Sequence, residues 1–541
     1  MKAKAIQGLN LHTKKNNKEG RKMKKFKLGI ISMIICVMLS FTACGNKGNG
    51  GTTNTQSDKY RITIACQSEE SEKDVLEILV DAFEAKYSNY EIEIKTFSGK
   101  DFENYMLSMA QNIESSPHIV WTSDSIHARW HRYFTDLRPF YERDASTDYS
   151  LYYESMLDTA SLNGEFRPTK NYKGSFRADR LDTEHDGTEF DTNHSEYGIY
   201  YAPRDYNKPA IVCNTALIEE LDTQYEAYMG ANLPEGYQSI EERLNSIVAG
   251  TNWSELDDLF DFSTLIAERV NYVVDASLSA GDMKINSYWK TKYAIDLKLN
   301  WEPTYVTLLN AMGIETMFNA DGTINLQNEA AKLEELHGKL YSIDRICNSD
   351  GVDTDFATGY TFMKIVSRPV VLGIMNTFKG TYGRAAVQSI QIPVQDIAAG
   401  NSGYAINYYY YDQTVTVNGV TKAYQDICWD FIKFVITEEG QQVGGASGSN
   451  IPVLKSLRDT GAWRSVADLE GMNHDAWIAG GELKQDWFDI YTSNSRAGFR
   501  GAFASFFTNF SKENYGEGSL SALFARLQTD YSALNPTANV R

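Results

Sequence analysis

The chain has 541 residues, of which 42% are hydrophobic, enough to build the cores of two or three domains. Its formal net charge is −19, and from position 44 onward it carries 42 basic against 70 acidic side chains, a net charge of −28. A field of this sign repels nucleic acid and anionic lipid headgroups, so we expect neither as a partner.

The sequence predicts an export signal that begins at Met23. Lysines within positions 24–27 form a basic segment, and the apolar run 28–41 suits a signal peptide but is too short to cross a bilayer. Thr42 and Ala43, directly before Cys44, resemble the lipobox of bacterial lipoproteins. The resemblance implies cleavage before Cys44, a diacylglyceryl thioether on its sulfur, and a place on the outer face of the cytoplasmic membrane. An ordinary signal peptide with an incidental Cys44 is the alternative.

Residues 1–43 are therefore predicted to be a leader and lipoprotein signal peptide. Residues 44–59 are rich in Gly, Asn, Thr and Ser and have little to bury, which predicts a flexible tether. No later apolar run approaches the roughly 20 residues of a spanning helix, so we expect the folded body to be soluble.

Strand and helix patterns alternate along the folded region. Residues 60–66 alternate and are β-branched, 74–87 carry apolar residues at helical spacing, and 91–97 alternate again. A helix at 102–113 and a buried strand at 119–121 follow, which indicates βαβ units with a parallel sheet. The later pattern predicts strands at 198–202, 210–214, 370–375 and 389–393, and helices at 262–270, 305–312, 330–341 and 423–436. Two α/β lobes are the simplest arrangement of these elements.

Residues 161–196 interrupt the pattern with a polar segment that we interpret as an insertion or long surface loop. Within it, 182–187 resembles the first half of a calcium loop, but Asn193 stands where a bidentate carboxylate is needed. We expect a solvated acidic loop and no metal site.

The six cysteines do not form metal-binding motifs. Cys36 lies in the signal and Cys44 at the lipidation site, and the remaining four lack CxxC spacing. These four are Cys66, Cys213, Cys347 and Cys428. We expect buried free thiols, with one disulfide left open as an alternative.

Several different short motifs follow one another along the folded chain. They are 79–87 with 91–94, 117–124, 198–206, 211–214, 313–322, 356–359 with Met363, and 431–435 with 451–453. Their order and spacing resemble the extracellular solute-binding proteins of carbohydrate ABC transporters, the family that includes maltose-binding protein. The motif PHIVWTSD at 117–124 is similar to the family's PDVVWVSD, with His118 in place of the usual Asp.

The resemblance implies an α/β fold of the periplasmic-binding-protein type II, with two lobes joined by a multi-strand hinge that closes on ligand. The chain would cross near Pro203, return near Gly403 and cross back near Pro452. Lobe one would then comprise 60–203 and 403–452, and lobe two 204–402 and 453–541. The resemblance further implies a monomer without a cofactor that captures a sugar or oligosaccharide and delivers it to ABC permease subunits in the membrane.

A sugar site combines aromatic faces for the apolar side of a pyranose with polar side chains for its hydroxyls. The chain holds 33 Tyr, 25 Phe and 9 Trp. Because open α/β sheets bind ligands beyond the carboxyl ends of their strands, we select residues just past the first three strands. They are Gln67, Glu69, Ser98, Lys100, Asp101, Trp121, Ser123 and Asp124. Asp124 is equally consistent with a helix N-cap.

The crossings and the second lobe supply the other candidates. They are Arg204, Asp205, Tyr206, Trp301, Asn376, Phe378, Tyr404 and Tyr408. Arg204 offers a planar fork for two hydroxyls, and a lobe-locking pair with Asp205 is the alternative. Phe378 is the nearest match to the aromatic that stacks on sugar in the family, whereas Trp301 fits the core of lobe two equally well. A strand at 408–411 would present alternate tyrosine rings to the ligand.

Other classes of protein remain open at this point. A binding lipoprotein for peptides or for a membrane sensor is one, and a carbohydrate-active enzyme is another, because glycosidases also carry aromatic clefts and paired carboxylates. The chain lacks the HExxH, GxSxG and Walker-type motifs. We therefore predict a binding protein and no catalytic residues.

Overall fold

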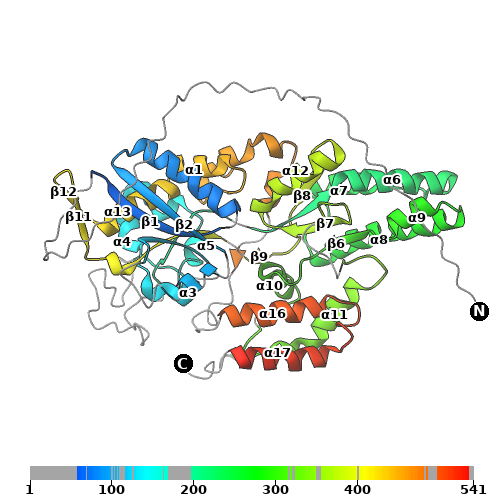
Figure 1. Cartoon of the computed structure of the whole chain (residues 1–541). Helices are drawn as coiled ribbons and strands as arrows, with labels where there is room; N and C mark the ends of the chain where they lie inside the picture. The colour runs from blue at the N-terminus through cyan, green and yellow to red at the C-terminus, as the bar shows by residue number, and fades with distance from the viewer. Residues whose placement is uncertain are drawn as a thin grey trace, which may run out of the picture. The chain divides into compact units, whose positions relative to one another are not determined.

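A computed structural model describes the folded body of the chain (Figure 1). The described residues are 58–68, 70–98, 101–102, 104–106, 108, 116–124, 127–162, 164–168, 197–206, 208–314, 317–319, 323–348, 355–395, 397–398, 401–479, 483–484 and 496–534. The predicted signal peptide, Cys44 and the loop 182–193 lie outside them.

A five-stranded sheet carries the N-terminal lobe. Its order is β2 (Tyr90–Phe97), β1 (Tyr60–Gln67), β3 (Ile119–Ser123), β10 (Ser402–Ile406) and β4 (Ala202–Pro203). Strand β1 runs parallel to β2 and β3, whereas β10 runs antiparallel to β3 and β4. The helix α1 (Glu70–Lys86) connects β1 to β2, and its buried Phe83 meets Phe431 edge-on at 5.3 Å. Phe431 lies on α13 (Tyr424–Ile436), which is followed by α14 (Glu438–Ala446).

A four-stranded sheet carries the second lobe. Its order is β6 (Tyr293–Asp296), β7 (Thr361–Val366), β5 (Ala210–Asn214) and β8 (Val387–Ile390). Strand β6 is parallel to β7, and β5 is antiparallel to both of its neighbours. The helices α6 (Thr215–Met229), α7 (Ile240–Val248) and α8 (Leu256–Ser279) pack against this sheet, and α9 (Met283–Trp289) packs on α8.

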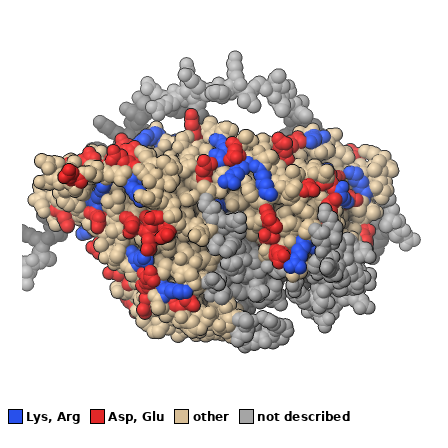
Figure 2. All heavy atoms as spheres, turned by 180° about the vertical axis from the view of Figure 1, so that it is seen from behind, with Lys and Arg blue, Asp and Glu red and all other residues tan. Residues whose placement is uncertain are grey.

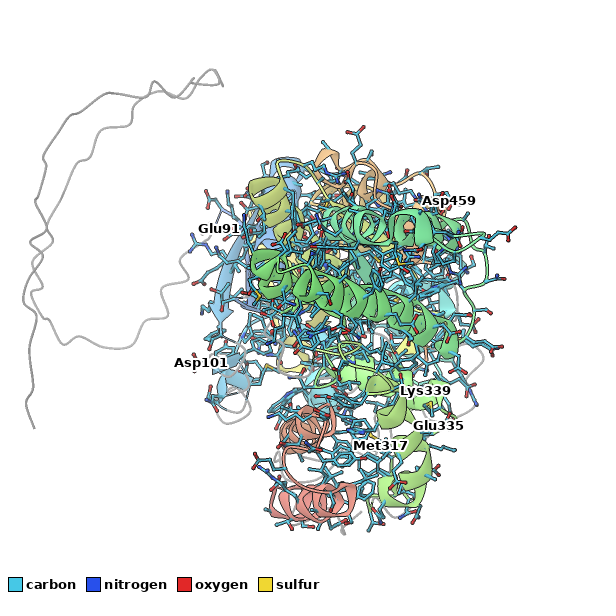
Figure 3. The ribbon with its side chains drawn as sticks, turned by 90° about the vertical axis from the view of Figure 1, so that its right-hand side faces the viewer. Glu91, Asp101, Met317, Glu335, Lys339 and Asp459 are labelled. Carbon is cyan, nitrogen blue, oxygen red and sulfur yellow. The ribbon has the colours of Figure 1, made fainter. Side chains whose placement is uncertain are left out.

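A helical layer adjoins the second sheet. It contains α10 (Glu302–Ala311), α11 (Ala330–Leu340), α16 (Arg496–Phe510) and α17 (Leu520–Leu534). The ring of Tyr305 on α10 stacks on Phe507 of α16 at 4.4 Å, and buried Met317 lies near α11 and α16 (Figure 3). On α11, Lys339 pairs with Asp257 at 2.7 Å and lies 3.8 Å from Glu335 (Figure 3). An aromatic core therefore ties the C-terminal helices to α10.

The remaining α-helices and strands of the described chain lie between these elements. They are α3 (His127–Trp130), α4 (Arg138–Glu142), α5 (Glu154–Asp158), α12 (Val371–Tyr382), β9 (Ile397–Ala398), β11 (Thr414–Val417), β12 (Val420–Ala423) and β13 (Leu483–Lys484).

The three chain crossings between the lobes are hydrogen-bonded to one another. The Arg204 N–H donates to Ser402 O at 2.8 Å, and the Tyr206 N–H donates to Ile451 O at 2.8 Å. The buried side chain of Gln441 donates to Arg204 O at 2.9 Å and accepts from the Val453 N–H at 2.7 Å. The lobes are thus joined by a multi-strand hinge, while the lobe boundaries inferred from the sequence stay a prediction.

Most elements fall where the sequence predicts them, with three clear exceptions. The strand predicted at 198–202 is one, because β4 comprises only Ala202–Pro203 and residues 198–201 are not in a strand. The strand predicted at 370–375 is wrong, because Val371, Met375 and Phe378 are buried along one face of the helix α12. The tyrosine run at 408–411 is not a strand either. It forms a 3-10 turn, Tyr408–Tyr410, whose N-cap Asn407 accepts from the Tyr409 N–H.

The cysteine prediction is confirmed for Cys66, Cys213, Cys347 and Cys428, which are all buried and form no disulfide within the described part of the chain. Acidic and basic side chains are interspersed over the face shown in Figure 2. None of the helices in the described ranges combines the length and the apolar character that a bilayer crossing requires.

Candidate ligand-binding site

The carboxyl ends of the parallel strands meet at one edge of the five-stranded sheet. Gln67, the last residue of β1, stands opposite Phe97, the last of β2, and Ala65 stands opposite Val120 of β3. The first residue of β10, Ser402, faces Ser123 across the antiparallel pair. The structure therefore places Gln67, Trp121 and Ser123, which were all selected from the sequence, at the same edge of the sheet.

Trp121 is nearly enclosed at this edge. Its side chain is 6% exposed, its ring meets Phe102 edge-on at 5.7 Å, and its indole N–H donates to Glu72 Oε2 at 2.9 Å. Ser123 and Asp124 are also buried, and the Asp124 N–H donates to Asn401 O at 3.2 Å. The indole is thus held in one orientation, with its N–H already bonded within the protein.

Arg204 forms the centre of a buried ionic cluster. The guanidinium is 1% exposed, and its Nη2 lies 2.8 Å from Glu72 Oε2, 3.0 Å from Asp205 Oδ2 and 2.9 Å from Ser402 Oγ. Nη1 donates to the Tyr404 hydroxyl at 3.3 Å. The pair with Asp205, the alternative left open by the sequence, is present, and it occupies the guanidinium within the protein.

Opposing effects set the protonation of this cluster. Burial alone would lower the pKa of Arg204, but Glu72, Tyr404 and Asp205 together raise it well above its usual value. Burial raises the pKa of Asp205, and Glu72 adds to that rise, whereas Arg204 opposes it. The arginine therefore stays charged, and its charge opposes the rise in the pKa of Asp205.

Two tyrosines of the crossings are part of the surrounding core. Tyr404 is fully buried between β3 and β4, and burial raises the pKa of its hydroxyl. Tyr206 is buried with its ring 5.0 Å from Tyr153. Both shape the wall behind the strand ends.

Tyr408 lies at the wrong end of the sheet for the predicted role. Because β10 runs antiparallel to β3, Ile406 pairs with Ile119 at the start of β3, and Tyr408 follows beyond it. Its ring lies 5.4 Å from Tyr411. The predicted strand that would present its ring to the ligand is therefore wrong, and Tyr408 lies beyond the end of β10 that is opposite to Ser402.

Phe378 and Asn376 do not follow a strand, contrary to the prediction. Both lie on α12, where Asn376 is exposed and Phe378 is 0% exposed. The Phe378 ring packs 5.3 Å from Phe356 and 5.2 Å from Tyr382, so it is core. The strand that carries Met363 is β7, and it is followed by buried Arg368.

The remaining candidates are divided between the two lobes. Trp301 is half-buried at the N-terminus of α10, with Lys298 Nζ 5.6 Å from its ring centre. Asp101 is exposed and accepts from the Ser98 hydroxyl at 2.6 Å (Figure 3). Glu69 and Lys100 lie outside the described residues.

The structure adds groups that sequence reasoning missed. Glu72, in the first turn of α1, joins Trp121 to Arg204. Phe97 and Tyr105 stack at 4.1 Å beside the end of β2, both half-buried. In the second lobe, Lys364 and Asp296 form a buried pair at 2.7 Å near the end of β6. Phe97 was visible as the last apolar residue of its strand, whereas the two ion pairs join distant segments and had no local signal.

No family model and no curated protein matches the sequence. Solved structures match its fold over nearly the whole chain. The GacH receptor of Streptomyces glaucescens, solved unliganded and with acarbose, has a TM-score of 0.55 at 14% identity over 88% of this chain and 98% of that one. A Rhizobium etli sugar transporter in an open conformation gives 0.55 at 15% over 88% and 99%.

A third match is an ABC substrate-binding protein of Listeria monocytogenes in complex with cycloalternan, with a TM-score of 0.52 at 11% identity over 90% and 100% of the two chains. At these identities the likeness establishes the architecture and nothing finer. The chain has the two-lobed α/β fold of the maltose-binding type of periplasmic binding protein.

Proposed function

We propose that this chain is the sugar- or oligosaccharide-binding protein of an ABC importer, held on the outer face of the cytoplasmic membrane by a lipid on Cys44. The observation that carries the proposal is the correspondence of fold, over nearly the whole of each solved chain, with binding proteins whose described ligands are acarbose, maltose, cycloalternan, ribitol and tagatose. The signal and lipobox pattern of residues 24–44 supports export and anchoring.

The arrangement at the strand ends supports a neutral, hydroxyl-rich ligand. The edge of the first sheet offers the indole of Trp121, the amide of Gln67 and the hydroxyl of Ser123, which together supply an aromatic surface and hydrogen-bonding groups. Trp301 supplies a ring from the second lobe. In this proposal Arg204 holds the wall of the site and does not bind ligand.

The mechanism follows from closure about the hinge. A ligand held by both lobes stabilises the closed state through contacts that the open state cannot make. The hydrogen bonds that join the crossings at Ser402, Tyr206 and Gln441 would keep them together while the lobes rotate. The permease would then recognise the closed form, and the sugar would be released unaltered.

The proposal is tested by binding and by the absence of turnover. Residues 56–541 are titrated with a panel of oligosaccharides by calorimetry, and each mixture is then analysed by chromatography. We expect binding of at least one neutral oligosaccharide without any product. Products would indicate a carbohydrate-active enzyme, and binding of peptides alone would indicate a peptide receptor.

Trp121→Ala provides a residue-level test. If the indole contacts sugar, the substitution weakens binding by roughly 1–3 kcal/mol. Trp253→Ala is the matched control, because Trp253 is similarly buried and its indole N–H donates to Gln391 O at 2.7 Å in the second lobe. Equal affinity of the Trp121 variant and the control would assign Trp121 to the core alone.

A further inference from the structure

A separate pocket lies on the second lobe, between the helices α6 and α8 and the loop 233–239. Its volume is about 520 Å³, within the range of small-molecule sites. The side chains that matter for its chemistry are Tyr225, Tyr237, Gln238, Glu268, Arg269 and Tyr272. Figure 3 shows α6 and α8 facing the viewer, and neither helix includes any residue of the site proposed above.

The wall of this pocket is fixed by a buried ion pair. Arg269 Nη1 lies 2.7 Å from Asp222 Oδ1, and both side chains are buried. Asp222 also accepts from the N–H groups of Ile240 and Glu241 at 3.0 Å, which secures the start of α7 directly after the loop. Arg269 Nη2 donates to Gln238 O at 2.5 Å. The loop is therefore held in place before any ligand arrives, which lowers the entropic cost of binding.

Aromatic rings line the pocket in a defined arrangement. Tyr225 and Tyr237 are nearly parallel, with an angle of 14° and 6.0 Å between centroids. The guanidinium carbon of Arg269 lies 5.0 Å from the first ring and 4.8 Å from the second. Tyr272 meets Tyr225 edge-on at 5.1 Å and is 36% exposed, which leaves ring surface available.

The charges around the rings select the class of ligand. Aromatic rings with nearby carboxylates often bind cations, but Arg269 already places a positive charge against Tyr225 and Tyr237. That guanidinium, whose charge is compensated by Asp222, takes the position at these two rings that a ligand cation would need. The exposed Glu268 carboxylate accepts hydrogen bonds, and the exposed Gln238 amide both donates and accepts them. A neutral ring with an apolar face and several hydroxyls satisfies all of these groups.

We propose that this pocket is a second carbohydrate site, which takes a neutral pyranose unit against Tyr272 and hydrogen-bonds it to Glu268 and Gln238. It does not depend on the site at the strand ends. A long glycan bound at the pocket would keep its free end close to the strand-end site of the same chain. The effective concentration of sugar at that site would therefore rise.

The test counts binding sites on the full chain, kept in a detergent without a sugar headgroup. An array of neutral oligosaccharides identifies the best ligand, and calorimetry with that ligand then gives the stoichiometry. The variants are Tyr272→Ala, Glu268→Gln and Trp121→Ala. Tyr288→Ala is the matched control, because Tyr288 is 38% exposed on α9 and does not line the pocket.

We expect two sites per chain, of which Tyr272→Ala weakens one by roughly tenfold or more. Glu268→Gln should weaken the same site, Trp121→Ala the other, and Tyr288→Ala neither. A single site insensitive to Tyr272→Ala would overturn the pocket proposal alone, and a single site sensitive to it would overturn the strand-end site alone. Absence of any bound glycan would overturn both. Tyr272-dependent binding of a lysine- or arginine-rich peptide would overturn the choice of ligand.

Discussion

Removal of the Arg204 side chain should destabilise the protein more than loss of an exposed ion pair does. Arg204→Met removes the cation that compensates Glu72 and Asp205 and leaves both carboxylates within the hinge region. Removing one partner from a buried pair costs about 3–5 kcal/mol of unfolding free energy, whereas an exposed pair is worth roughly 0–1 kcal/mol. We expect the larger range, because Arg204 is enclosed and also loses its bonds to Ser402 and Tyr404.

The loss should depend on pH in a specific direction. Burial already raises the pKa of Asp205, and removal of Arg204 removes the influence that opposes this rise. The folded variant then holds a proton that the unfolded chain releases, so its stability falls as pH rises above the usual carboxylate range. The difference from wild type should accordingly be smaller at pH 5 than at pH 8.

Guanidinium unfolding of residues 56–541, followed by tryptophan fluorescence at both pH values, measures the effect. Arg143→Met is the matched control, because Arg143 pairs with Asp426 at 2.7 Å and both side chains are exposed. The reasoning would be refuted by a loss no larger than that of the control, or by an equal loss at pH 5 and pH 8.

Further predictions follow from other buried groups. Burial lowers the pKa of His118 to about 4 from its usual 6.5, so the unfolded chain binds a proton that the folded chain does not, and stability should fall by up to roughly 3 kcal/mol from pH 6.5 to 4. Urea midpoints should show this fall in wild type and a smaller one in His118→Gln; parallel profiles would contradict it. Phe378→Ala should cost about 3–5 kcal/mol of stability and leave sugar affinity unchanged, and reduced affinity at full stability would argue for ligand contact. A thiol reagent should label none of the four cysteines in folded residues 56–541 and all four after denaturation. Labelling of only two cysteines in the denatured chain would reveal a disulfide.

The sequence predicted the elements whose periodicity is unambiguous. The segments 60–66, 210–214 and 423–436 match β1, β5 and α13 within about a residue, because strand alternation or helical spacing is clear in each. The run at 370–375 failed because a short apolar, β-branched segment fits a buried strand and a helix equally well. The helical spacing became visible only through Val371, Met375 and Phe378, which lie on one face.

The candidate site was only partly predictable, since its contacts span long distances along the chain. The rule of strand ends selected Gln67, Trp121 and Ser123, which do share an edge. The pairing of Glu72 with Arg204 joins residues 132 positions apart, and nothing local announces it. The direction of β10 likewise depends on its partner strand, and this direction decides that Tyr408 lies far from Ser123.

The late arrival of β10 has a consequence for how the protein is made. Until β10 emerges, β3 lacks its neighbour on one side, and the Asn407 amide that bonds Pro117 O is 290 positions downstream. An incomplete sheet with an open edge is aggregation-prone and slow to form, because closing such a distant contact costs chain entropy. The protein is proposed to work outside the membrane. Because the first lobe cannot finish folding until β10 has been made, most of the chain can stay unfolded and pass through an export channel.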